Sequence, residues 1–149
     1  MQKKNIVFVV IVSFILVLFI AFRGYCETVD NSFEQLKSEL KGKGVSDEFI
    51  KATENSVKRM LSFAASINDI KSVLLDLWNE GVKGIALKNA VAAVAELVAS
   101  GDNTLEAAKI TSGAAHKAEA EGLSGFGVGM RVKKAVQDRK EYLKTLNNK

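Results

Sequence analysis

The chain has 149 residues, 48% of them hydrophobic and 26% charged, with one cysteine, one histidine and no proline. This composition excludes a disulfide framework, which needs two cysteines, and a metal site of the usual kind, which draws on several His or Cys ligands. Collagenous and disordered chains are excluded as well, because apolar residues are abundant while glycine and proline are scarce.

The N-terminal residues 1–26 have the pattern of an export segment. Lys3 and Lys4 precede a 17-residue, almost entirely apolar run at 6–22, which Arg23 closes. The run is longer than the usual signal-peptide core of about 7–15 residues and reaches the lower limit, about 17, for a membrane-spanning helix. Residues 1–26 are therefore predicted to be either a signal peptide or a retained N-terminal membrane anchor.

The end of this segment leaves three processing outcomes open. Gly24 and Cys26 are small side chains at the positions that signal peptidase reads, which favours cleavage after Cys26. A retained anchor is the second outcome. Lipidation at Cys26 is the third, although Arg23 and Tyr25 do not fit the lipoprotein pattern. All three predict an extracytoplasmic protein, either periplasmic or secreted, or anchored in the inner membrane with its domain outside the cytoplasm.

The net charge of +4 comes mostly from this leader, which holds three basic and no acidic residues. From Glu27 onward 18 basic side chains face 17 acidic ones, so nucleic acid is not an expected partner. The positive charge that remains is concentrated at 131–149, with seven basic and two acidic residues. This end predicts either an ordinary solvated helix or a surface for anionic lipid or an acidic partner.

Residues 27–149 are predicted to form a single all-helical domain, because apolar residues recur with a period near 3.6. The first helix, of about ten residues, is expected to begin with a capping box of Ser32 and Gln35 and to stop at Gly42. Five further helices are expected from Ser46 to Ala65, from Ser66 to Gly81, from about Leu87 to Gly101, from Asp102 to Gly122 and from Gly125 to Leu146.

Glycines divide these helices into units of roughly 20 residues, which predicts a compact bundle or a short helical-repeat array. The large aromatic side chains are expected in the core. Twelve alanines at 86–120 offer less apolar area, so this half is expected to be the less stable one. The expected aromatic core residues are Phe33, Phe49, Phe63, Trp78 and Phe126.

Two features of the sequence superficially resemble chemical sites. His116 lies on an alanine-rich helix without an orienting acid or further ligands, so it is predicted to be a surface residue. The glycines at 125–129 resemble a phosphate-binding loop, but no strand precedes them and no Lys-Ser or Lys-Thr follows. They are predicted to form a flexible turn or a strip for close helix approach. No catalytic, cofactor-binding or metal-binding residue is predicted, and the protein is not expected to be an enzyme.

The helix junctions carry one resemblance to known proteins. Gly44-Val45-Ser46, Gly81-Val82-Lys83 and Gly122-Leu123-Ser124 each join a glycine, an apolar residue and a third residue that begins the next helix. Over residues 44–142 the chain resembles small exported bacterial proteins that are all-helical and functionally uncharacterised. The resemblance implies a fold but no activity, cofactor or functional residue.

Two functions remain as hypotheses. The first is a non-enzymatic exported cell-envelope protein that acts as an interaction or structural module. Its partner would be an unknown protein or envelope component, with membrane association through residues 6–22 or the basic C-terminal helix. The alternative is binding of a small apolar ligand or lipid between helices.

Overall fold

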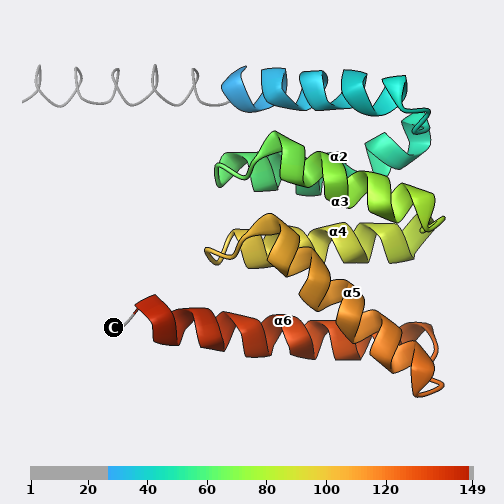
Figure 1. The fold of residues 1–149 in the computed structure, drawn as a ribbon, viewed down its shortest axis with the longest axis vertical. Coiled ribbons are helices and arrows are strands. Elements are labelled where there is room, and N and C mark those ends of the chain that lie inside the picture. Colours follow the sequence, from blue (N-terminus) through green and yellow to red (C-terminus); the bar gives the residue numbers. More distant parts are fainter. Residues whose placement is uncertain (1–26, 148–149) are drawn as a thin grey trace, which may run out of the picture.

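The computed structural model describes residues 27–147, in which every regular element is an α-helix (Figure 1). The predicted all-helical fold is therefore confirmed for this part of the chain. The expectations for the leader lie outside the described residues, including the apolar run at 6–22 and the processing site at Cys26.

Six helical segments follow one another along the chain. Residues 27–42 are helical, and α2 (Asp47–Ser62), α3 (Ile67–Asn79), α4 (Gly84–Val98), α5 (Thr104–Ala120) and α6 (Gly125–Asn147) follow. The last five agree with the predicted helices, with small differences at their ends. The predicted start of the first helix is wrong, because Ser32 lies inside a helix that already includes residue 27. Asp30, in the turn before Ser32, binds Lys58 of α2 at 2.9 Å, so a tertiary contact supports helix before the expected cap.

The five junctions between these helices share one backbone geometry. In each, a residue with positive φ is followed by an amide that donates a hydrogen bond of 3.0–3.1 Å to the carbonyl five residues earlier. This is the Schellman turn, which satisfies carbonyls that a helix end leaves open. The repeat seen in the sequence is thus a repeat of one turn. Its positive-φ residues are Gly44, Ala64, Gly81, Gly101 and Gly122.

Capping side chains begin three of the following helices, as the sequence predicted. The hydroxyl of Ser46 accepts a hydrogen bond from the amide of Phe49 at 3.3 Å, and Ser66 does the same for Asp69 at 3.4 Å. Asn103 caps α5 in the same way. Because each turn ends one helix and its next residues begin another, the chain reverses over a few residues.

The helices form layers that follow one another down the stack, and the chain runs back and forth across it (Figure 1). Contacts recur between helices two apart in the chain, with α2 against α4, α4 against α6 and α3 against α5. This pattern is typical of stacked helix pairs. Residues 27–42 and α6 form the outermost layers in Figure 1, while α4 contacts α2, α5 and α6 and lies in the middle.

One cluster of buried apolar side chains runs through all six helical segments. The two helices of the half expected to be weaker differ, because α4 buries six apolar residues while most residues of α5 are exposed or half-buried. Two core predictions are wrong, since Phe63 is 53% exposed at the end of α2 and Phe126 is 85% exposed on the first turn of α6. The largest fully buried side chains are Leu36, Leu40, Met60, Ile70, Leu74, Leu87 and Leu97.

Candidate functional site

His116 lies on the exposed face of α5, as predicted. Its Nδ1 is 3.7 Å from a carboxylate oxygen of Glu119, and both side chains are more than half exposed. A carboxylate this exposed to solvent does not hold the ring firmly in one orientation, as acid–base catalysis would require. The residue therefore forms part of a solvated helix face.

The glycine-rich segment at 125–129 forms the start of α6 itself, so the prediction of a flexible turn is wrong, while the strip for close approach of another helix stays a prediction. A Cβ added to Gly125 or Gly129 would meet nothing within 4 Å, so no other described helix approaches them. A Cβ added to Gly127 would lie 3.1 Å from Cβ of Leu123, which belongs to the junction just before α6. The segment that precedes this glycine run is α5 and the junction after it, not the strand that a phosphate-binding loop requires.

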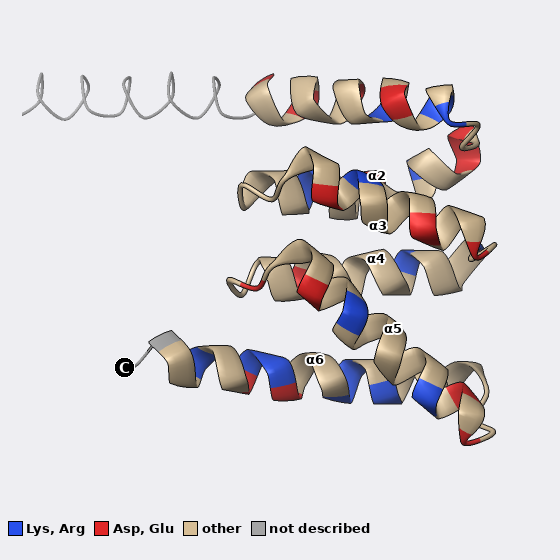
Figure 2. Cartoon of the chain, viewed as in Figure 1, with Lys and Arg blue, Asp and Glu red and all other residues tan. Residues whose placement is uncertain are grey.

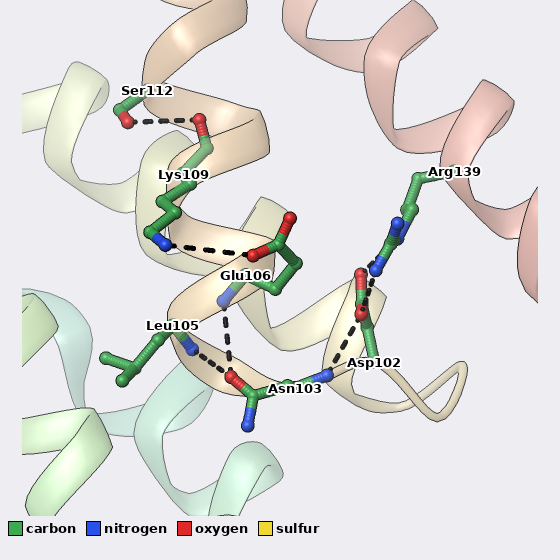
Figure 3. A network of polar contacts seen from close by, with 7 residues as sticks. All are labelled: Asp102, Asn103, Leu105, Glu106, Lys109, Ser112 and Arg139. Carbon is green, nitrogen blue, oxygen red and sulfur yellow. Dashed lines mark hydrogen bonds and ion pairs between the residues drawn. The ribbon is translucent and has the colours of Figure 1, made fainter.

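The described residues contain one buried ionised side chain, Asp102, at the junction between α4 and α5. Its carboxylate, 3% exposed, binds the guanidinium of Arg139 on α6 in the bidentate manner (Figure 3), with both nitrogen–oxygen distances at 2.8 Å. The amide of Asn103 donates a third hydrogen bond to it at 3.0 Å. The hydrogen bonds to Asp102 raise the pKa of Arg139 above its ordinary value, while burial opposes the shift.

The same junction fixes the start of α5 and the position of α6. The side chain of Asn103 accepts hydrogen bonds from the amides of Leu105 and Glu106, at 2.9 and 3.2 Å (Figure 3). Lys140, the residue after Arg139 in α6, binds Glu96 of α4 at 2.8 Å. Asp102 and Glu96 thus clamp the C-terminal half of α6 against the middle of the stack. Both carboxylates of the clamp are bound to basic side chains of α6, so neither is available as a catalytic group.

This pair was not predicted from the sequence, although the repeated junction contains evidence for one of its two members, Asp102. Asp102 occupies the junction position after the positive-φ residue, and the other four junctions fill that position with apolar residues. A charged group in an otherwise apolar position indicates a buried partner. The partner could not be named, because Arg139 lies 37 residues further along the chain. The four apolar residues are Val45, Ala65, Val82 and Leu123.

Two hollows mark the described surface, and both are open to solvent. The first, of about 260 Å³, lies between α5 and α6 and has an alanine floor with charged side chains around it. The second, of about 320 Å³, lies between the α2–α3 and α4–α5 junctions and is lined mainly by small and polar residues. Neither is an enclosed apolar cavity between helices. The first hollow is lined by Ala114, Lys117, Ala118, Arg131, Lys134, Ala135 and Asp138.

The exposed side of α6 combines large apolar side chains with cations, which Figure 2 shows as blue segments along this helix. Phe126 is 85% exposed and Met130 53%, and the lysines that follow them are exposed too. Burying a phenylalanine gains roughly 1.5–3 kcal/mol, which Phe126 forgoes in the free protein. We call this side the outer surface of α6. It consists of Phe126, Met130, Lys133, Lys134, Gln137, Glu141 and Lys144.

No protein-family model, no curated protein and no solved structure matches the chain. Over residues 27–147 no helix is long and apolar enough to cross a membrane. In the same residues no three His, Cys, Asp or Glu side chains gather as they would around a metal ion. Among the large apolar side chains of the described residues, Phe126 on the outer surface of α6 is the most exposed.

Proposed function

We propose that the protein is a non-enzymatic, exported module of the cell envelope that acts through the outer surface of α6. The observation that carries this proposal is the exposure of Phe126, on a helix that is otherwise firmly held. The clamp of Asp102 with Arg139 fixes α6 against the stack, so the surface is presented in one orientation. A rigid, exposed aromatic residue is a typical anchor for a binding partner.

Export remains part of the proposal and is supported by the pattern of residues 1–26. The segment acts as a signal peptide or as an anchor in the inner membrane, with the helical stack outside the cytoplasm. The resemblance to small exported helical proteins supports the same location. Ligand binding between the helices is not proposed, since neither hollow offers an enclosed apolar site.

Lysine footprinting tests the proposed function on the unmodified protein. Intact envelope and purified protein are treated with an acetylating reagent, and modification of each lysine is quantified by mass spectrometry. Lys133 and Lys134 are expected to react more slowly in the envelope than in the purified protein. Lys51 of α2 and Lys88 of α4, which are exposed elsewhere, serve as controls and should react equally in both. Equal reactivity of all four lysines in both samples would overturn the proposal.

A further inference from the structure

We propose that the outer surface of α6 docks on an anionic phospholipid bilayer. Phe126 and Met130 enter the boundary between headgroups and acyl chains, while Lys133 and Lys134 contact lipid phosphates. This inference rests on the proposed function and names the partner of the same surface.

The spacing along α6 places these four residues on one side of the helix. At about 100° per residue, positions 126, 130, 133 and 134 fall within roughly a quarter to a third of the circumference. All four side chains are exposed, whereas Val136 and Leu143 on the opposite side are buried. The helix therefore buries one side in the stack and offers a second apolar and basic side to a partner.

The cations on this side are free to meet an external charge. The three lysines at 133, 134 and 144 form no ion pair or hydrogen bond with any described residue. By contrast, Arg131 binds Glu121 at 2.6 Å, and the other two cations of the helix bind acidic groups of the stack. An anionic membrane surface attracts such lysines, each by about 1 kcal/mol.

Acidic side chains outnumber basic ones in the rest of the chain from residue 27, so the charge of the molecule is asymmetric. Residues 27–130 carry 11 basic and 15 acidic side chains, whereas 131–149 carry seven basic and two acidic ones. An anionic bilayer attracts α6 and repels the remainder of the stack, so charge alone orients the protein.

The first hollow offers a place for a headgroup beside this surface. Lys117 of α5 and Lys134 of α6 both line it, and neither has an ion-pair partner among the described residues. Arg131 also lines it, and Asp138 is the one acidic group in its wall. An alanine floor between cations leaves space for a phosphate without excluding water from it. We therefore expect the hollow to hold a lipid phosphate while the outer surface of α6 contacts the bilayer.

The combination of protruding apolar side chains and lysines without ion pairs favours a bilayer over an acidic protein as the partner of this surface. The apolar part of the surface is two protruding side chains on the first turns of a helix, and neither lines a hollow among the described residues that could receive a partner's side chains. Amphipathic helices use this arrangement at membranes, where apolar tips reach below a plane of charged headgroups. An acidic protein partner is an outcome that the following experiment distinguishes.

The test reads position 126 directly in the full chain. Phe126→Trp is introduced together with Trp78→Phe, so that fluorescence reports only on the α6 site. The protein is mixed with vesicles of neutral phosphatidylcholine, with or without an anionic phosphatidylglycerol fraction. Because the reporter is local, attachment of another part of the chain to the vesicles gives no signal. The expected result is a shift of emission to shorter wavelength, and quenching by brominated lipid, with anionic vesicles only.

Matched variants test the role of the lysines. Lys133→Gln with Lys134→Gln should lower the bound-to-free ratio at position 126 by about 25-fold, since each lost lysine is worth roughly 1 kcal/mol. Lys51→Gln with Lys88→Gln removes the same charge elsewhere and should leave the ratio unchanged. The inference is overturned if position 126 gives no shift with anionic vesicles, or an equal shift with neutral ones. Protected Lys133 in the envelope without a shift on vesicles would keep the proposed function and exclude lipid as its partner.

Discussion

The junction after α2 offers a sharp test of the fold, because it alone lacks a glycine at the positive-φ position. Ala64 has a φ of 57°, while the corresponding glycines have φ between 72° and 90°. An L-residue with a Cβ is strained in this region, whereas glycine is not. We therefore predict that Ala64→Gly stabilises the protein, and that Gly101→Ala destabilises it.

The magnitude follows from two opposing effects. The left-handed conformation costs alanine about 1–2 kcal/mol, and glycine returns about 0.4–1 kcal/mol of this by increasing the entropy of the unfolded chain. Ala64→Gly should therefore raise the free energy of unfolding by about 0.5–1 kcal/mol, or Tm by roughly 2–3 °C at this chain length. A Cβ at Gly101 would meet nothing within 4 Å, so Gly101→Ala should lose about the same amount through backbone strain alone.

The assay is thermal unfolding of the full chain, followed by the helical circular dichroism signal under identical conditions for each variant. Ala92→Gly is the matched control, since Ala92 is exposed in the interior of α4. There the same substitution should cost about 1 kcal/mol. If Ala64→Gly lowers Tm as Ala92→Gly does, the repeated turn does not hold this junction and the reasoning is wrong.

Three further predictions concern side chains. Arg139→Ala strands a buried carboxylate and should cost about 2–3 kcal/mol in urea unfolding, whereas Arg131→Ala, which breaks an exposed pair, should cost under about 1 kcal/mol. Phe126→Ala should change stability by less than about 0.5 kcal/mol, while Phe49→Ala in the core should cost about 3–5 kcal/mol; similar losses would show that Phe126 is buried. Hydrogen bonds from Lys71 of α3 and from Gln35 lower the pKa of Glu39 below its ordinary value. This contact therefore stabilises the fold at pH values above the ordinary pKa, and the stabilisation is lost as the pH falls through the lower pKa of the folded protein. Glu39→Gln should therefore flatten the acid side of the stability curve, and an unchanged curve would contradict the assignment.

The helices could be predicted from the sequence because their ends are determined by nearby residues. A glycine with positive φ and a capping residue two positions later act within one turn, as Gly101 and Asn103 do. The helical state of residues 27–31 could not be found in this way, and their ion pair to another helix, between Asp30 and Lys58, joins residues far apart in the sequence.

Burial was harder to predict than helix position. Phe126 was expected in the core because it is a large aromatic residue, but neither size nor apolar periodicity distinguishes the side of a helix that packs in the stack from the side exposed to solvent. The alanines of α4 similarly suggested weak packing, although Leu87, Val91 and Leu97 place this helix in the centre. Both outcomes depend on how the helices stack, which residue spacing does not specify.

The central claim is that the outer surface of α6 is the part of the molecule that meets the cell envelope. Its most direct test is a photoreactive amino acid placed at Phe126 in the cells that make the protein, with Asn55 on the exposed side of α2 as the matched control position. After illumination, we expect a mass increase equal to a phospholipid at position 126 and none at position 55. Absence of any adduct at position 126, or equal yields at both positions, would contradict it.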